Sequence, residues 1–279
     1  MYMRLKKLML RDCHRKTRSQ VNQNMFSRAD KIRALVDPAS QRGLEIGALN
    51  SPAIYPSEGE VYYVDHLPTD ELKEKYSPDP NVNIEDIVPV DYVWGDKTLV
   101  EAVGQGVYFD YLVASHVVEH VPDMIGWFEE ISAVLKPGGV LSLVVPDKRF
   151  TFDCQRDVSR ASEFIEAFLL KSRKPSLRQV FDSHYSSAPV ETGFAWSEGF
   201  QPANLDNVHS HPKGVFDLCR KILDDDLYLD SHCYTFTPES FGEIFNSILQ
   251  LELTDFELVH LFPTEVNGME FYVSLRKPM

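Results

Sequence analysis

The stretch 43-GLEIGALNSP-52 decides the fold of this chain. Its first half, 43-GLEIG-47, is a short apolar run around one acidic residue, and this pattern predicts a buried strand. Gly47 follows, and a residue without a side chain lets the main chain turn and bring its N–H groups close to a ligand. The stretch therefore predicts a nucleotide-type ligand beyond the strand, although Gly47 alone is equally consistent with a simple turn.

Similar runs recur along the chain and alternate with stretches of helical period, which predicts a mainly parallel sheet covered on both faces. Further strands are expected at 61-VYYVD-65, weakly at 82-VNIED-86, and at 109–115, 139–145, about 254–262 and 269–275. The clearest helices are expected between Asp123 and 136-KPGG-139, and over 237–250. Residues 150–233 break the alternation, so we expect a helical insertion there that forms a lid.

Composition excludes several classes of protein. Hydrophobic residues make up 43% and charged residues 25% of the 279 residues, which is typical of a folded domain. The longest apolar runs, such as 140-VLSLVV-145, are too short to cross a bilayer. Four scattered cysteines form no CxxC pair, so we expect neither disulfides nor a zinc knuckle, and a cytoplasmic location.

Charge is distributed unevenly along the chain. Residues 1–33 hold ten Lys or Arg against two Asp or Glu, while the whole chain has a net charge of −14. The acidic remainder argues against nucleic acid as a partner, because phosphate binding needs clustered cations. We expect residues 1–36 to be a basic, loosely packed extension with possible peripheral contact to acidic lipid, and residues 37–279 to be the functional domain.

The spacing of acidic residues narrows the ligand. Asp65 ends the second expected strand eighteen residues after Gly47, near the separation at which a carboxylate accepts both hydroxyls of a ribose. Glu45 in the first strand suits a cationic ligand. Leu49 and Pro52 stand where a dinucleotide fingerprint has glycines, which disfavours NAD or FAD. The pattern favours an adenosyl group without a pyrophosphate.

Four motifs in order carry a more specific resemblance: 44-LEIGA-48, 63-YVD-65, 110-DYLVASHVVEHVPD-123 and 135-LKPGG-139. Together they resemble the class I S-adenosylmethionine-dependent methyltransferases, of the type 11-like kind. The resemblance implies an α/β, Rossmann-like, doubly wound seven-stranded mixed sheet in the order 3-2-1-4-5-7-6. It also implies that the seventh strand is antiparallel and that S-adenosylmethionine is the cofactor.

The resemblance also assigns roles to single residues. It implies that the methionine part of the cofactor is held by Glu45, Gly47 and Ala48. It implies that the ribose and the adenine are held by Asp65, His66 and Asp86. It implies that the floor under the sulfonium is formed by Ser115 and His116. The chain departs from the family pattern at Leu49, where a second glycine is common.

The acceptor is expected beyond the fifth strand. The segment 146-PDKRFTFD-153 mixes charged and aromatic residues, as sites for hydroxylated ligands do. With 232-HCYTFTPESF-241, it resembles a subgroup associated with bacterial polysaccharide and glycan gene clusters. We therefore expect O-methylation of a sugar or another small hydroxylated acceptor. The candidates for the general base that removes the hydroxyl proton are Asp147 and His232, followed by His184 and His209.

Other interpretations stay open at this point. His116, Glu119 and His120 are spaced as metal ligands can be, but local packing accounts for them, and we expect no metal. The pair His209 and His211 lacks further ligands at tidy spacing. The chain could be a degenerate methyltransferase fold that serves as a binding or scaffold module, or a nicotinamide-dependent oxidoreductase.

Overall fold

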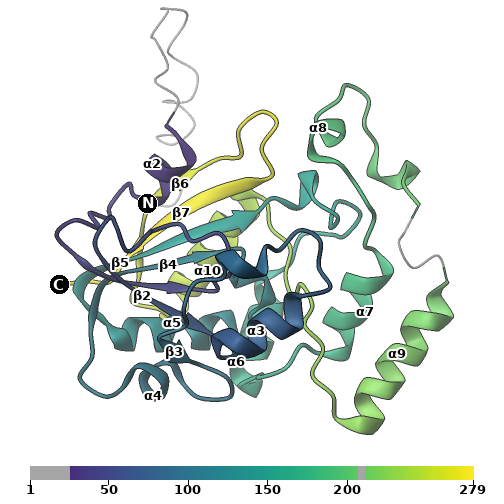
Figure 1. The fold of residues 1–279 in the computed structure, drawn as a ribbon. Helices are drawn as coiled ribbons and strands as arrows, with labels where there is room; N and C mark the ends of the chain where they lie inside the picture. Colours follow the sequence, from purple (N-terminus) through teal and green to yellow (C-terminus); the bar gives the residue numbers. More distant parts are fainter. Residues whose placement is uncertain (1–25, 207–210) are drawn as a thin grey trace, which may run out of the picture.

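Seven strands form one sheet in the order β3-β2-β1-β4-β5-β7-β6 (Figure 1). The computed structural model describes residues 26–206 and 211–279. Neighbouring strands are parallel except β7, which runs antiparallel to both β5 and β6. The strands are β1 Arg42–Ile46, β2 Glu60–Asp65, β3 Tyr92–Val93, β4 Phe109–Ser115, β5 Leu135–Pro146, β6 Glu257–Phe262 and β7 Glu270–Arg276. This arrangement confirms the α/β fold and the strand order implied by the resemblance.

The third strand lies elsewhere than the sequence predicts. Residues 82–86 hold a 3-10 turn instead, and β3 is the two-residue strand Tyr92–Val93. The side chain of Asn83 accepts a hydrogen bond from the amide of Glu85 at 3.3 Å. Such a local bond offers the backbone an alternative to a strand ladder, which explains the difference. Asp86 therefore precedes β3, whereas we expected it to follow the third strand.

Helices cover both faces of the sheet (Figure 1). Those that flank the strands are α2 Arg28–Ile32, α3 Thr69–Tyr76, α4 Leu99–Val103, α5 Met124–Val134 and α10 Pro238–Gln250. Short 3-10 turns are η1 Ile84–Asp86, η2 Val118–His120 and η3 Lys148–Phe150. The two helices expected from hydrophobic period, α5 and α10, are confirmed within one or two residues, because each has a side-chain cap, Asp123 and Thr237.

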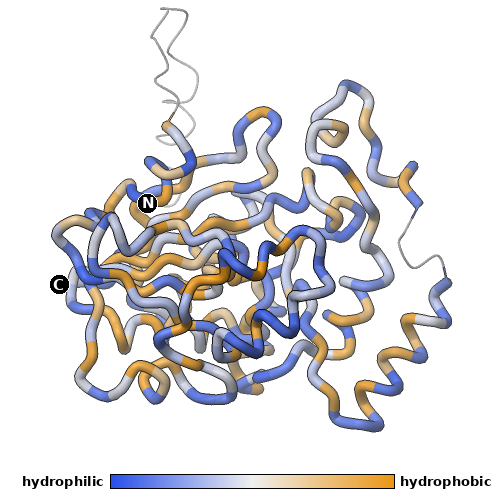
Figure 2. Tube along the Cα trace, viewed as in Figure 1, coloured by the Kyte–Doolittle hydropathy of each residue, from blue (hydrophilic) through white to orange (hydrophobic). Residues whose placement is uncertain are grey.

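Strand residues alternate between two apolar cores. Leu112 and Leu143 face the larger core, which α4, α5 and α10 cover, whereas Tyr111 and Val144 face the smaller one on the other side. This alternation is the two-residue period of a strand whose two faces are both buried. Apolar residues accordingly concentrate along the central strands (Figure 2).

The segment between β5 and α10 is helical, as expected, but it is not one separate body. It contains α6 Ala161–Leu170, α7 Leu177–Tyr185, α8 Thr192–Ala195, η4 Pro202–Asn204 and α9 Pro212–Asp225. Helix α6 belongs to the main core through Phe164, whose ring stacks on Tyr234 at 3.9 Å between centroids. Helices α7 and α9 share a small core of their own around Val180 and Val215 and stand beside the sheet (Figure 1).

The described part of the basic N-terminal segment packs on the domain. Ile32 is buried in the smaller core, and the buried Lys31 places Nζ 2.7 Å from Glu265 Oε2. Helix α2, which lies within the segment expected to be a loosely packed extension, is therefore in contact with the folded domain. Residues 1–25, which carry most of the positive charge, lie outside the described residues. Within the described ranges, no helix combines the length and apolar character needed to span a bilayer.

We predict that Phe128→Ala lowers the free energy of unfolding by about 3–5 kcal/mol. Phe128 is fully buried, and its ring lies 6.1 Å from Phe245 and 6.0 Å from Phe256 between centroids. Urea denaturation measures the loss. Tyr108→Ala, at an exposed aromatic residue, is the control and should change the value by less than about 0.5 kcal/mol. A similar loss in both variants would contradict the assigned core.

Candidate functional site

The loop after β1 lies against the end of β2. Gly47 donates its N–H to the carbonyl of Val64 at 3.0 Å, so Gly47 and Asp65 are neighbours at the carboxyl edge of the sheet. Gly47 has φ +68°, and a Cβ built on it would lie 3.1 Å from Cγ2 of Val117. The backbone has a left-handed conformation at Gly47, and the side chain of Val117 lies close to it, which explains why the position holds a glycine.

Leu49 adopts the left-handed backbone that glycine usually supplies. Its φ is +47°, a conformation that costs a residue with a Cβ on the order of 1 kcal/mol. The amide of Val88 donates to the carbonyl of Leu49 at 2.9 Å and holds the loop in place. The loop therefore keeps a glycine-like course at the position where the chain departs from the family pattern.

Glu45 shapes this loop from inside. Its side chain is buried, and its two carboxylate oxygens accept hydrogen bonds from the amides of Ala53 at 2.7 Å and Ile54 at 3.1 Å. Burial raises the pKa of Glu45 to about 7, although these two hydrogen bonds oppose the rise. The carboxylate of Glu45 thus holds the backbone of the loop through hydrogen bonds. Ala48, in the same loop, is buried, with 8% of its surface exposed.

Asp65 and His66 form a connected pair at the end of β2. Oδ1 of Asp65 accepts hydrogen bonds from the amide and from Nδ1 of His66, at 2.7 and 2.6 Å. Nε2 of His66 lies 2.8 Å from Nζ of Lys75. Because both contacts of His66 go to Oδ1, Oδ2 of Asp65 is the carboxylate oxygen left for a ligand. Asp86 is exposed in η1, where its carboxylate accepts from Asn83 at 2.6 Å.

Ser115 and His116 end β4 under the N-terminal helix. Arg28 donates from Nη2 to Oγ of Ser115 at 2.9 Å and from Nε to Glu270 at 2.7 Å. His116, with φ +53°, places Nε2 2.7 Å from the other oxygen of Glu270. Burial opposes ionisation of Glu270, but hydrogen bonds from His116, Arg28 and Tyr272 lower its pKa to about 2.

A cavity of about 570 Å³ opens beyond the carboxyl ends of β4 and β5. In an open α/β sheet this is the edge where ligands bind. Its lining comes from both sheet and insertion: His116, Glu119, His120, Pro146, Phe150, Thr151, Phe152, Pro189, Val190, Glu191, Thr192, His232 and Met269. A second hollow, of about 660 Å³, lies by α6 and α7 among charged side chains such as Arg178 and Asp182, away from this edge.

Asp147 does not line this cavity. It is fully buried, and Arg149 donates to both of its carboxylate oxygens, at 2.9 Å from Nε and 2.6 Å from Nη2. Thr264 donates to Oδ2 at 2.7 Å as well. A carboxylate with its oxygens engaged in this way has no site for the proton of an acceptor hydroxyl. The structure therefore does not support the expectation of Asp147 as general base.

His232 does line the cavity. Its Nδ1 lies 2.5 Å from Oδ2 of Asp153, and Asp153 also accepts from Arg156 at 2.9 Å. Burial opposes ionisation of Asp153, but the hydrogen bond from His232 and the charge of Arg156 lower its pKa. An imidazole that donates from Nδ1 to a carboxylate keeps a lone pair on Nε2. His184 lies within 3.5 Å of the Ser231 hydroxyl, and His209 is outside the described residues.

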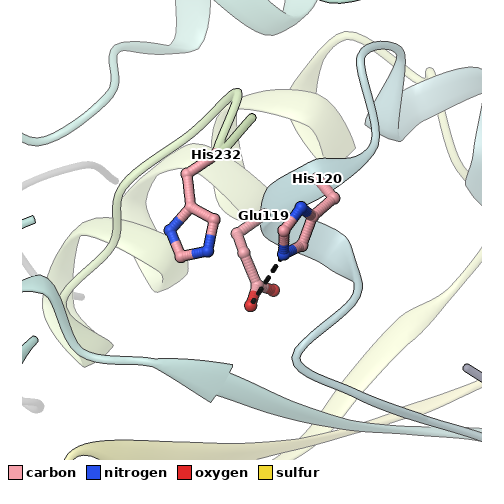
Figure 3. Close-up of side chains that lie close together, drawn as sticks. All are labelled: Glu119, His120 and His232. Carbon is pink, nitrogen blue, oxygen red and sulfur yellow. Dashed lines mark ion pairs between the residues drawn. The ribbon is translucent and has the colours of Figure 1, made fainter. Parts of the chain in front are cut away.

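Glu119 and His120 approach His232 from η2 (Figure 3). Nδ1 of His120 lies 3.0 Å from Asp230, and Nε2 lies 4.0 Å from Oε1 of Glu119. Burial lowers the pKa of His120, but the hydrogen bond to Asp230 and the charge of Glu119 raise it more. Among the described residues, neither carboxylate oxygen of Glu119 has a hydrogen-bond partner.

Sequence reasoning missed the carboxylates behind the two histidines. Asp230 stands two residues before His232 but binds His120, and Asp153 was noticed only as part of the segment after β5. The spacing of His116, Glu119 and His120 is visible in the sequence, and local packing is a sufficient explanation for it there. His232, which joins Glu119 and His120 in the structure, lies more than a hundred positions further along, and no spacing rule connects it to them.

One comparison with known proteins shows the family of this chain. The family model described as "Methyltransferase domain" matches residues 21–210, more than half of the chain. No curated protein matches the chain.

Three solved structures with a similar backbone are each below 25% identical to this chain. The CcbJ methyltransferase from Streptomyces caelestis is 13% identical, with 93% of this chain and 100% of that chain covered and a TM-score of 0.43. The glycopeptide N-methyltransferase MtfA in complex with sinefungin is 14% identical, with 91% and 94% covered and a TM-score of 0.43. The CurJ carbon methyltransferase is 13% identical, with a TM-score of 0.39; the match covers 89% of this chain but spans only about half, 51%, of CurJ.

We predict that Glu45→Gln flattens the pH dependence of stability. Since folding raises the pKa of Glu45 from about 4.5 to about 7, the folded state binds this proton more tightly, and stability falls as pH rises through that window. The full effect is on the order of 3 kcal/mol. Urea unfolding at several pH values between 4.5 and 7.5 measures it. Glu129→Gln, at an exposed site, should keep the wild-type slope, and an unchanged slope in Glu45→Gln would refute the assignment.

Proposed function

We propose, on the premise that this chain belongs to the methyltransferase-domain family, that it methylates a hydroxyl group of a sugar or another hydroxylated small molecule. The chain is an S-adenosylmethionine-dependent methyltransferase by that membership. One observation carries the choice of site. Val117 lies against Gly47, and its neighbour His116, which follows β4, lines the cavity, so we place the donor on one side of this turn and the acceptor on the other.

The residues at the first edge suit the cofactor. The backbone turns at Gly47, Ala48 and Leu49, and Gly47 has no side chain, which leaves room for the methionine part of the cofactor. We assign Oδ2 of Asp65 to the ribose hydroxyls, and His66 and Asp86 to the neighbourhood of the adenine. Glu45 acts through the loop that it holds, and Ser115 and His116 form the floor, fixed by Arg28 and Glu270.

Methyl transfer needs little covalent chemistry from the protein. When bound, the cofactor supplies a methyl group whose bond to sulfur breaks as an acceptor lone pair forms the new bond, and the electron pair stays on sulfur. The chain must align the acceptor atom and exclude water. The mixture of Phe150 and Phe152 with Glu119 and imidazoles in the cavity suits a ligand that stacks and forms hydrogen bonds.

His232 is the residue that we assign to activation of the acceptor. Asp153 fixes its tautomer, so Nε2 keeps a lone pair at the cavity, where the ring is 11% exposed. Such a nitrogen can accept the proton of a hydroxyl. Phe152 packs against the ring at 4.7 Å between centroids and restrains its orientation.

Several finer points belong to the same proposal. The mixed polar and aromatic cavity supports an acceptor of the kind that glycan-cluster methyltransferases use.

Buried Cys154, Cys219 and Cys233, which form no disulfide, fit a reducing, cytoplasmic setting. The scaffold interpretation would leave the open cavity and the oriented His232 without a purpose, and the nicotinamide interpretation meets Leu49 and Pro52 in place of glycines.

We predict that Asp65→Ala weakens binding of S-adenosylmethionine by about 10- to 100-fold, because hydrogen bonds to a charged group contribute about 1.5–3 kcal/mol. Isothermal titration with the cofactor and with its demethylated product measures the affinity. Asp70→Ala, at an exposed residue in the first turn of α3, should bind as tightly as the wild type. Absence of cofactor binding by the wild type would remove the proposed enzyme activity.

We predict that His232→Asn lowers the rate of methyl transfer by about 100- to 10,000-fold and leaves cofactor affinity unchanged. Asp153→Asn should also reduce the rate, since it releases the tautomer of His232. Mass spectrometry of hydroxylated acceptors, sugars first, detects the gain of one methyl group. Methylation of amines but not of any hydroxylated acceptor would contradict the proposed substrate class.

A further inference from the structure

The unused carboxylate of Glu119 indicates a ligand that the chain itself does not supply. We propose that Glu119, His120 and His232 bind a divalent first-row transition metal ion in the wall of the acceptor cavity. The three residues each offer one ligand atom, and these atoms lie within 4.8 Å of one another (Figure 3).

Burial of Glu119 is the first argument. Its side chain is 1% exposed, and among the described residues neither oxygen has a hydrogen-bond partner. A buried carboxylate that accepts no hydrogen bond is costly, because it loses its hydration and keeps only its charge interactions with His116 and His120. The nearest cationic or donor atoms are Nδ1 of His116 at 3.7 Å and Nε2 of His120 at 4.0 Å, both beyond hydrogen-bonding distance. A metal ion between these groups would remove the cost.

The orientation of the two histidines is the second argument. His120 turns Nδ1 to Asp230 at 3.0 Å, and His232 turns Nδ1 to Asp153 at 2.5 Å. Metal-bound histidines commonly donate their other ring N–H to a carboxylate in this way, which fixes the tautomer and makes the ligand nitrogen more basic. The two rings meet edge to face at 4.6 Å between centroids. Both histidines thus present Nε2 toward Glu119.

The main chain holds this cluster together independently of any ion. The amides of Cys233 and Tyr234 donate to the carbonyl of Glu119, at 2.7 and 3.2 Å. These bonds bring the segment that carries His232 to the turn that carries His120. The ligand set is therefore built into the fold, and its donor atoms need to move by about an ångström or less to reach the separations of a Zn²⁺ site.

The chemistry of the ligands selects the kind of ion. Two imidazoles and one carboxylate suit Zn²⁺, Fe²⁺ or Mn²⁺ better than Mg²⁺ or Ca²⁺, which prefer oxygen ligands alone. Three protein ligands leave a coordination position that faces the cavity. If the proposed function holds, an acceptor oxygen would take this position. With the ion bound, Nε2 of His232 would be a metal ligand, so the proton-accepting role assigned to it above applies to the metal-free chain. The ion would instead orient the acceptor and lower the pKa of its hydroxyl, whose proton would leave to solvent.

Direct titration tests the site. The full chain, stripped with a chelator, is titrated with Zn²⁺, Mn²⁺ and Mg²⁺ by calorimetry. We expect one Zn²⁺ per chain, and weaker binding of Mg²⁺ than of either transition ion. Glu119→Gln should weaken Zn²⁺ binding at least about 100-fold, and Asp153→Asn or Asp230→Asn about 10- to 100-fold. His211→Gln, which removes an exposed imidazole at the start of α9, should bind as the wild type does.

Thermal unfolding gives a second measurement that does not depend on activity. Zn²⁺ should raise the Tm of the wild type but not that of Glu119→Gln. Without metal, Glu119→Gln should melt at a higher temperature than the wild type, because a neutral amide replaces a buried carboxylate that accepts no hydrogen bond. A lower Tm for the metal-free variant, Zn²⁺ binding that survives Glu119→Gln, the absence of saturable binding, or Mg²⁺ binding as tight as that of Zn²⁺ would each overturn the proposal.

The same samples separate this inference from the proposed function. Gly47 and Asp65, which we assign to the cofactor, are not members of the metal cluster, although His116 of the assigned floor lies 3.7 Å from Glu119. Titration with S-adenosylmethionine therefore reports on the enzyme and titration with Zn²⁺ on the metal site. Cofactor binding without metal binding would remove only the metal site. Metal binding without cofactor binding would remove only the methyltransferase function.

Discussion

The acceptor side of the molecule depends on one contact, in which the carbonyl of Glu119 accepts hydrogen bonds from the amides of Cys233 and Tyr234. Each such bond contributes only about 1 kcal/mol to stability. Its importance is geometric, because it joins the turn after β4 to the end of the insertion and so closes the cavity between them. His120 and His232, far apart in sequence, face each other because this contact, with the hydrogen bond from the Tyr234 hydroxyl to the carbonyl of Pro122, fixes the two segments.

Glu119 can be compared with two other buried carboxylates near this edge of the sheet, both of which accept hydrogen bonds from the chain. Asp147, next to the same edge, is bound by Arg149 and Thr264, and Glu45 is bound by two amides. Glu119 differs from both, since it is equally buried but neither of its oxygens accepts a hydrogen bond within the described chain. Natural sequences break a local rule of this kind mainly at functional sites, where the cost is met by a ligand or by the activity. The contrast among three buried carboxylates, rather than burial alone, singles out Glu119.

Local signals predicted that Gly47 and Asp65 lie together. Gly47 follows the end of β1, and Asp65 stands at the end of β2, the next strand along the chain. Because β1 and β2 are parallel neighbours, their carboxyl ends lie together, so the sequence spacing was enough to predict that the two residues are close. The prediction of a strand at 82–86 was wrong because the side chain of Asn83 caps a 3-10 turn there. The actual third strand, β3, has only two residues and so leaves little pattern in the sequence. Asp147 failed for another reason. A sequence cannot show that a carboxylate is already taken by Arg149 and by Thr264, which is 117 positions away. The acceptor side, assembled from distant segments, was visible only as single candidates such as His232.

His116 connects the two sides and explains why the N-terminal helix matters to the site. Its left-handed backbone turns the chain from β4 toward η2, and its ring is held by Glu270. Glu270 is in turn held by Arg28 of α2, which also reaches Ser115. A change in how α2 packs would therefore move Glu270 and His116 together, between the loop of Gly47 and the cavity of His232. Since methyl transfer depends on alignment within a fraction of an ångström, a helix that touches neither assigned ligand still sets the geometry of the reaction.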